Sequence, residues 1–344
     1  MGIKKYAVKR ILTGFVTFLV VIAMNYFLFR LPMYILGISP AELYGFQKIF
    51  KQGYQPQQAE EIIEELRVKM GIPPEDASIW LRLQYFGRYI YNMLTFNFGE
   101  SYFPPGRGKP VLGLLMARLP KTVLLIGLGV FISMILGIWM GAWAAYNPGG
   151  KRDKAIVGTG LGIYAIPPFW LQLVCIYIFA VVLNIFPVAG GTSTFLYDPT
   201  LFNTIDLLYT ISLPVLTLVL INFGFWIVLM RNAMASTMSE DYIFTARAKG
   251  LDEEAIIYGH ALRNAILPVW TNILIAVANI WTGAIITERL FTIRGVGNLL
   301  LESVYNQNYP LEQLIFFFIA FTTIAANILA DLTYGLLDPR VRYD

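Results

Sequence analysis

The charged residues whose spacing could do chemistry are concentrated in one stretch, residues 240–268, which lies between two long apolar runs. Acidic residues open the stretch, two cations precede Gly250, and a second acidic group follows this glycine at 252–254. A connection that only joins two membrane helices could be short and formless. The pattern of helix, glycine bend and helix instead indicates a structured element on which another component acts.

Each part of this element has a local sequence signal. Residues 240–249 favour a helix, and Gly250 can adopt the left-handed conformation that ends it. Asp252 is then placed to cap a second helix, because aspartate is a preferred N-cap residue and acidic residues stabilise a first turn. We expect this second helix to run from Glu253 towards Pro268 and into the next apolar run.

One stripe of the first helix, formed by Ile243, Ala246 and Gly250, carries small or apolar residues. Arg247 and Lys249 lie in its last turn, where positive charge complements the helix dipole. The stripe suits close seating in the groove of a partner protein, and an amphipathic helix that rests on lipid headgroups is an equal alternative.

The chemistry of several enzyme classes is missing from the sequence. It has no Gly-xxxx-Gly-Lys-Ser/Thr phosphate-binding loop, no His-Glu-xx-His and no Gly-x-Ser-x-Gly. A single cysteine, Cys175, and a single histidine, His260, exclude cysteine-cluster and multi-histidine metal sites, so no metal is expected. The net charge of +4 and the lack of a basic stripe with interleaved aromatics argue against nucleic-acid binding.

The composition is that of a polytopic membrane protein. Hydrophobic residues make up 57% of the 344 residues and charged residues only 14%, against roughly 25% charged in soluble domains. A span needs about 20 mostly apolar residues. We predict an all-α protein whose six spans cover 11–30, 122–146, 155–183, 211–231, 265–287 and 313–336.

The first apolar run, from Ile11 to Phe29, is long enough to span and is not followed by a small-residue cleavage site. We therefore interpret it as an uncleaved helix rather than a signal peptide. Placing both termini in the cytoplasm also puts most loop cations inside, as the positive-inside rule requires. Those cations are Lys4, Lys5, Lys9, Arg10, Lys151, Arg152, Lys154, Arg231, Arg247, Lys249, Arg263, Arg340 and Arg342.

The spans lack the ionisable residues of an ion-coupled carrier. Asp331 comes nearest, but it lies close to a span end, and we expect it to pair with a cation such as Arg340 or Arg342. The chain thus has the body of a translocator without a visible energy source, which leaves a partner-driven transporter, a passive channel and a structural membrane protein as alternatives.

The segment at 31–120 is expected to form a small, mostly helical extracytoplasmic subdomain, with a flexible loop as the alternative. Its patterns predict helices at Gln57–Met70 and from Ala77 to about Met93. Pro167 and Pro168 lie within the third predicted span, where they should kink the helix beside a pore or merely for packing. Small residues for close helix approach are Gly137, Gly141, Gly158, Gly160 and Gly162.

A resemblance becomes specific at this point. Asp241 to Leu251 (Asp-Tyr-Ile-Phe-Thr-Ala-Arg-Ala-Lys-Gly-Leu), followed by His260 to Pro268, resembles the coupling loop of ABC importer permeases, in particular the first of the two permease subunits of the dipeptide and oligopeptide branch. Further landmarks in the family's order are Gln84–Gly87, Phe98–Ser101, Arg118–Pro120, Pro168–Trp170, Phe186–Pro187, Leu213–Thr217, Glu288–Phe291, Gly295–Gly297, Asn308–Pro310 and Leu337–Tyr343. The wider signature's Glu-Ala-Ala is replaced by Phe244-Thr245-Ala246.

The resemblance implies a cytoplasmic N-terminus and first helix at 1–30, the extracytoplasmic subdomain at 31–120, and a five-helix permease core at 121–344 with its coupling loop at about 236–264. It implies partners: a second homologous permease subunit, two ATPase subunits that bind ATP and magnesium, an extracytoplasmic solute-binding protein and membrane lipids. This chain would bind no cofactor. The contact residues implied are Asp241, Ile243, Ala246, Arg247, Ala248, Lys249, Gly250, Leu251 and Asp252, with Asp241 the candidate acidic contact. A peptide is the first choice of substrate, and oligosaccharide or nickel are alternatives.

Overall fold

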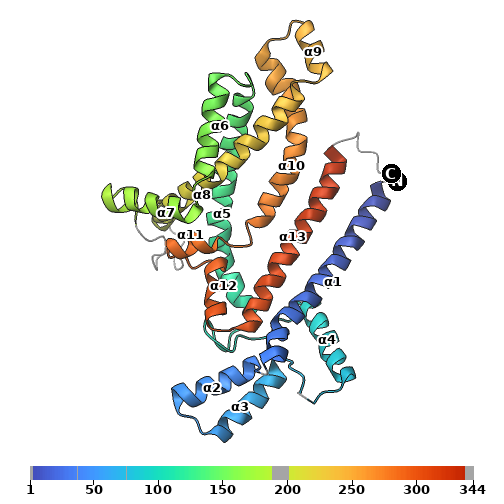
Figure 1. Cartoon of the computed structure of the whole chain (residues 1–344), viewed down its shortest axis with the longest axis vertical. Helices are drawn as coiled ribbons and strands as arrows, with labels where there is room; N and C mark the ends of the chain where they lie inside the picture. Colours follow the sequence, from blue (N-terminus) through green and yellow to red (C-terminus); the bar gives the residue numbers. More distant parts are fainter. Residues whose placement is uncertain (1–2, 37, 75, 188–200, 338–344) are drawn as a thin grey trace. The chain divides into compact units, whose positions relative to one another are not determined.

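The computed structural model describes residues 3–36, 38–74, 76–187 and 201–337, and within these ranges the chain is built from helices without a β-strand (Figure 1). Two compact units are distinguished: unit 1 comprises 1–10, 119–298 and 325–344, and unit 2 comprises 11–118 and 299–324. The helices of the described part are α1 Ile3–Leu36, α2 Pro40–Gln52, α3 Pro56–Lys69, α4 Ile79–Leu94, α5 Val111–Ala144, α6 Lys151–Tyr164, α7 Pro168–Cys175, the π-helix η1 Ile176–Val182, α8 Leu201–Thr237, α9 Asp241–Ala248, the π-helix η3 Ala255–Ala261, α10 Leu262–Asn279, α11 Ile285–Leu290, α12 Val296–Tyr305 and α13 Tyr309–Leu337.

The prediction of an all-α membrane protein is confirmed. Five helical stretches in the described part are long and apolar enough to cross a membrane, and a bent helix pair makes a sixth if it is counted as one span. These stretches are Lys5–Arg30, Val111–Ala144, Leu207–Thr237, Ala255–Asn279, Tyr309–Thr333 and the pair Lys151–Tyr164 with Pro168–Val182.

The fifth predicted span, 265–287, is wrong at its carboxyl end. The helix stops at Asn279, and α11 begins separately at Ile285. Gly283 lies between them with φ +89°, a conformation that cannot continue a right-handed helix, and a Cβ on it would lie 2.6 Å from the Gly297 nitrogen. Hydropathy contains no information about this close backbone approach, so the predicted span continued past the end of the helix.

The third predicted span is divided at its prolines. Helix α6 ends at Tyr164, α7 begins at Pro168, and the two helices are bent by 95°. Pro168 occupies the first helical position, where its missing N–H costs nothing, and Pro167 has the extended ψ of 128° that a following proline favours. No sequence feature distinguished this sharp break from a mild kink.

Close packing of α5 on α8 organises unit 1. A Cβ on Gly137 would lie 2.4 Å from that of Trp226, and one on Gly141 would lie 2.6 Å from the Ile227 carbonyl oxygen. The prediction that small residues permit close helix approach is confirmed at these two positions. It also holds for Gly160, which approaches α8, whereas Gly158 and Gly162 have open space at the Cβ position.

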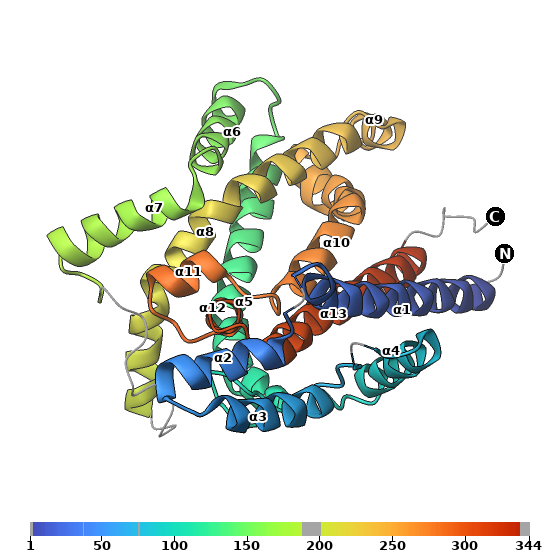
Figure 2. The ribbon, with the colours of Figure 1, turned by 60° about the horizontal axis from the view of Figure 1, so that its bottom comes forward.

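Unit 2 contains the two helices predicted from amphipathic patterns, which form α3 and α4. Helix α2, which was not predicted, packs along α3 (Figure 2). Their shared core contains Ala41, Tyr44, Leu66, Ile72 and Phe103. Because α2 is short and mixes charged with apolar residues, its helical period is hard to separate from loop composition.

Residues 11–36 of α1 and 309–324 of α13 also belong to unit 2 and pack on each other. The Phe18 and Phe317 rings lie 5.1 Å apart, and the Asn25 Nδ2 donates to the Gln313 carbonyl at 3.0 Å. In unit 1, Asp331 pairs with Arg10 at 2.9 Å instead of with the predicted Arg340 or Arg342, both of which lie outside the described residues.

Candidate functional site

Helix α9 ends at Gly250 in the way that the sequence predicts. Gly250 has φ +79°; its N–H donates to the Arg247 carbonyl at 2.9 Å, and the Leu251 N–H donates to the Ala246 carbonyl at 3.4 Å. This pair of bonds is the Schellman pattern, in which a left-handed glycine satisfies the last carbonyls of a helix. A Cβ on Gly250 would meet no atom within 4 Å, so the requirement for glycine here is conformational rather than steric.

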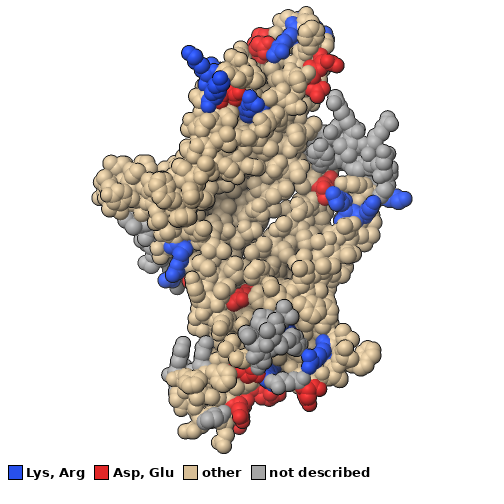
Figure 3. Space-filling model, viewed as in Figure 1, with Lys and Arg blue, Asp and Glu red and all other residues tan. Residues whose placement is uncertain are grey.

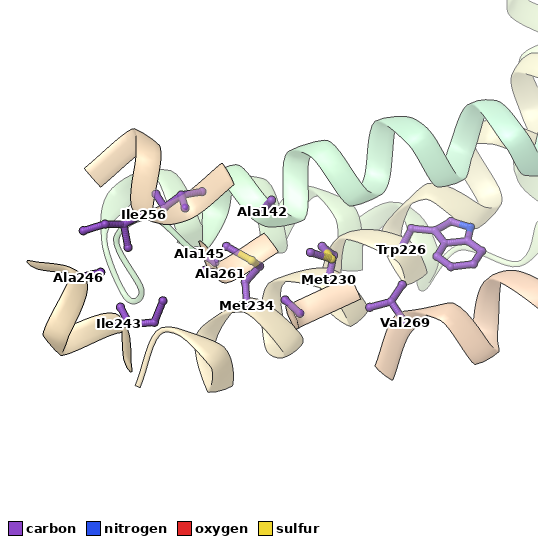
Figure 4. Close-up of a cluster of buried hydrophobic side chains, with 12 residues drawn as sticks. Ala142, Ala145, Trp226, Met230, Met234, Ile243, Ala246, Ile256, Ala261 and Val269 are labelled. Atoms are coloured by element: carbon purple, nitrogen blue, oxygen red, sulfur yellow. The ribbon is translucent and has the colours of Figure 1, made fainter. Parts of the chain in front are cut away.

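The apolar stripe of α9 packs inward. Ile243 is fully buried and Ala246 nearly so, in a cluster with Met230 and Met234 of α8 and Ile256 of η3 (Figure 4). The expectation that this stripe seats against another protein is therefore wrong for Ile243 and Ala246. A helical stripe shows which face of a helix is apolar, but it does not identify the surface that covers this face. Burial fastens α9 to the membrane helices of its own chain.

An ion pair between Arg247 and Glu253, the clasp, bridges the bend at Gly250. The Arg247 guanidinium donates to both carboxylate oxygens of Glu253, at 2.7 and 3.1 Å, across the turn that contains Gly250. The hydrogen bonds from Arg247 lower the pKa of the Glu253 carboxyl below its ordinary value. Both side chains remain partly exposed, so the clasp contributes about 1 kcal/mol at most.

The remaining predicted contact residues of the loop form few contacts within the chain. The Asp252 carbonyl accepts the Ile256 N–H at 3.0 Å, but its carboxylate forms no capping hydrogen bond among the described residues. Lys249 is exposed and forms no ion pair with any residue that the structure describes. Asp241 and Ala248 are also exposed, so these side chains face outward from the loop.

The outward face of the loop carries apolar side chains as well. Phe244 is 75% exposed, Leu251 41% and Tyr258 45%. Phe244 stands out because an aromatic ring on a short exposed helix costs hydrophobic free energy unless something covers it. The sequence reasoning noted Phe244 only as a departure from a signature and missed its exposure. Its position next to the buried Ile243 was the available signal.

The second helix begins as the π-helix η3, which the sequence did not reveal. It continues into α10 without interruption, and the Asn264 Nδ2 donates to the Tyr242 hydroxyl at 2.9 Å, which ties α10 to α9. Helix α9 is therefore linked by a side-chain hydrogen bond to α10, which belongs to a stretch long and apolar enough to span a membrane.

Charged side chains gather at the same end of unit 1: cations lie at the start of α6, and acidic and basic residues lie together around α9 (Figure 3). One of them is fixed: Arg231 of α8 donates two hydrogen bonds to the buried Asp153 of α6, at 3.0 and 2.6 Å, and the Gly149 N–H donates to the same carboxylate at 2.8 Å. Sequence reasoning missed this pair, although Asp153 interrupts a run of cations.

A second buried polar cluster lies elsewhere in unit 1. Glu288 of α11 is fully buried and accepts hydrogen bonds from the Thr122 hydroxyl at 2.8 Å and from the Asn298 N–H at 2.7 Å. Thr122 in turn accepts the Val296 N–H at 2.7 Å. The cluster joins α5, α11 and the start of α12, and it contains two of the motifs noted in the sequence.

Comparison with known proteins gives a consistent result. Residues 133–343 match the model of the family described as binding-protein-dependent transport system inner membrane component. A putative peptide transport system permease protein of Brucella abortus is 32% identical over 83% of this chain and 86% of its own length. An oligopeptide transport system permease protein of Bacillus subtilis is 34% identical (74% and 79%), and a dipeptide transport system permease protein of Escherichia coli is 30% identical (85% and 88%).

Proposed function

Because this chain belongs to the family of binding-protein-dependent transport system inner membrane components, and is a multi-pass protein of the cell membrane, we propose that it forms half of the translocation pore of an ATP-driven importer. A second homologous permease subunit supplies the other half. Two ATPase subunits bind ATP and magnesium, and an extracytoplasmic solute-binding protein delivers the substrate. This chain holds no cofactor and contacts membrane lipids but no nucleic acid.

The proposed cargo is a peptide. The relatives from Brucella abortus, Bacillus subtilis and Escherichia coli are named for peptide, oligopeptide and dipeptide transport, which favours this class over oligosaccharides or nickel. Uptake of labelled di- and oligopeptides, compared with a labelled oligosaccharide and with nickel, tests this choice in cells that express the complete transporter.

The single observation that carries the coupling proposal is the way α9 is built. One face is fastened into the core through Ile243 and Ala246, while the opposite face presents Phe244, Lys249 and Leu251 to a partner. In this proposal, closure of the ATPase pair pushes on the exposed face. The buried face and η3 then pass the movement to α8 and α10, as a rigid element that switches between two states.

The assignment of contacts differs from the one that resemblance alone implied. Phe244, Ala248, Lys249 and Leu251 form the proposed contact surface, with Asp241 and Asp252 as its acidic edges. The clasp partner Glu253 engages Arg247 within the chain, so we assign Arg247 to holding the bend.

Replacement of Gly250 by valine tests the lever. A β-branched residue is strained at φ +79°, so the bend should distort without a clash. We expect ATP hydrolysis by the assembled complex to continue while peptide uptake into vesicles falls about tenfold or more.

The matched control is Gly53→Val. Gly53 has φ +68° and equally open surroundings, but it lies in unit 2, so the same strain should leave coupling intact. Normal coupled uptake by the Gly250→Val complex would overturn the lever.

Replacement of Phe244 by serine tests the contact surface. Exposed aromatic anchors at interfaces commonly contribute 1–2 kcal/mol or more, so we expect the ATPase subunit to bind roughly tenfold more weakly. The control is Phe50→Ser, because Phe50 is also highly exposed but lies on α2. Equal ATPase binding by the Phe244→Ser variant and the unaltered protein would exclude Phe244 from the interface.

A further inference from the structure

Unit 2 contains a pocket of about 140 Å³, enclosed by the end of α1, the end of α3, one face of α4 and the start of α13. Its polar lining is cationic. Arg30, Lys69 and Arg88 contribute three positive charges and Glu100 contributes one negative charge, and Lys69 is also paired with Glu65 next to the pocket. The proposed pore and coupling loop do not use this pocket.

Two buried polar side chains form the inner part of the lining. Arg30 is only 5% exposed, its Nη2 donates to the Met70 carbonyl at 3.2 Å, and its guanidinium lies 4.7 Å from the centre of the Tyr26 ring. Tyr89 is 8% exposed, and its hydroxyl has no hydrogen-bond partner among the described residues. A buried hydroxyl without a partner is unfavourable, and a bound acceptor would satisfy it.

The charge state of this lining suits an anion. Burial raises the pKa of the Tyr89 hydroxyl, so it remains a hydrogen-bond donor at physiological pH. An arginine fork and a phenolic donor together match the oxygens of a phosphate group.

The pocket lies at the depth of lipid headgroups. The first span ends at Arg30 and the last span begins at Tyr309, and Pro310 and Gln313 of that span also line the pocket. Residues at the ends of two neighbouring spans occupy the boundary between hydrocarbon and water.

Helix α4 also carries an apolar face. Ile79, Trp80, Leu83 and Tyr91 are each more than half exposed, and at about 100° per residue they lie on one side of the helix, opposite the side that lines the pocket. A helix with exposed aromatic and aliphatic residues along one face suits the membrane interface, with that face among the acyl chains.

From the buried cationic pocket and its place at the ends of two spans, we propose that unit 2 binds one membrane phospholipid, whose phosphate occupies the pocket against Arg30 and Tyr89. Arg88 and Lys69 at the pocket rim attract the headgroup. The lipid would fasten α4 to α1 and α13 at the membrane surface.

The test measures phospholipid binding to the full-length chain, purified in detergent, stripped of lipid and titrated with dioctanoyl phosphatidylglycerol, with native mass spectrometry as the readout. We expect one lipid per chain. Tyr89→Phe removes only the hydroxyl and should weaken binding roughly tenfold, and Arg30→Gln should weaken it further.

The controls separate the phosphate from other causes. Tyr305→Phe removes an exposed hydroxyl from α12, and Arg107→Gln removes a charge from unit 2 outside the pocket; both should bind lipid normally. Dioctanoylglycerol, which has the same chains but no phosphate, should bind at least tenfold more weakly, and so should inorganic phosphate. Unchanged lipid binding in both Tyr89→Phe and Arg30→Gln, or equally tight binding of either probe, would overturn the proposal.

Discussion

Glu288 shows how a single buried side chain can organise several elements. One carboxylate oxygen accepts a hydrogen bond from the Thr122 hydroxyl of α5, and the other accepts one from the Asn298 N–H of α12. Both of these neighbours therefore need an acceptor at Glu288. Gly295 is also confined there, because a Cβ on it would lie 2.4 Å from the Glu288 carboxylate. The sequence showed Glu288 and Gly295 as motif residues but not that they are in contact.

Replacement of Glu288 by glutamine should therefore destabilise the protein. The amide group supplies one acceptor and one donor where the cluster needs two acceptors, which leaves a buried N–H or O–H unpaired at a cost of about 1–3 kcal/mol. Thermal unfolding in detergent should show a transition lower by several degrees. Glu254→Gln, at an exposed site, provides the control. A Glu288→Gln variant as stable as the control would mean that the cluster tolerates an added donor.

In the proposed coupling loop, features that depend on neighbouring residues in the sequence could be predicted. Features that depend on contacts with other helices could not. Gly250 was found because the left-handed end of a helix depends on a few neighbouring residues. The burial of Ile243 depends on Met230 and Met234, which belong to a different helix, and the pairing of Arg247 with Glu253 depends on the angle of the bend.

At the scale of elements, the sequence predicted the positions of the membrane spans but not their interruptions. The need to satisfy every backbone group in hydrocarbon forces long apolar helices, so the approximate position of each span follows from hydropathy. The interruptions follow from packing instead. Helix α10 ends near Gly283, which lies against Gly297, and hydropathy contains no information about such a backbone contact. Helix α2, which was not predicted, is held by contacts with α3 and Phe103.

Helix α9 illustrates how an element with few residues is held in place by its neighbours. Eight residues give too short a helix for stability in water, so α9 depends on its buried side and on the bonds at Gly250. An element held mainly by contacts with α8 and η3 moves with them, which is the property that the proposed coupling requires.

At the scale of the whole molecule, composition predicted the membrane class, and the order of short motifs predicted the family to which the chain belongs. The predicted orientation follows from charge asymmetry, and the cations at the start of α6 agree with a cytoplasmic location for that end of unit 1.

The single cysteine makes orientation directly measurable. Cys175→Ala gives a cysteine-free background, into which Glu61→Cys on α3 or Lys151→Cys at the start of α6 is introduced, both at exposed positions. If both termini are cytoplasmic, a membrane-impermeant maleimide should label the Glu61→Cys variant in intact cells, or in spheroplasts where an outer membrane is present. The Lys151→Cys variant should react only after permeabilisation, because the hydrocarbon core of the bilayer keeps a charged reagent from the inner face. The opposite labelling pattern would place α9 outside the cell, where no ATP-driven partner could reach it, and would contradict the coupling proposal together with the orientation.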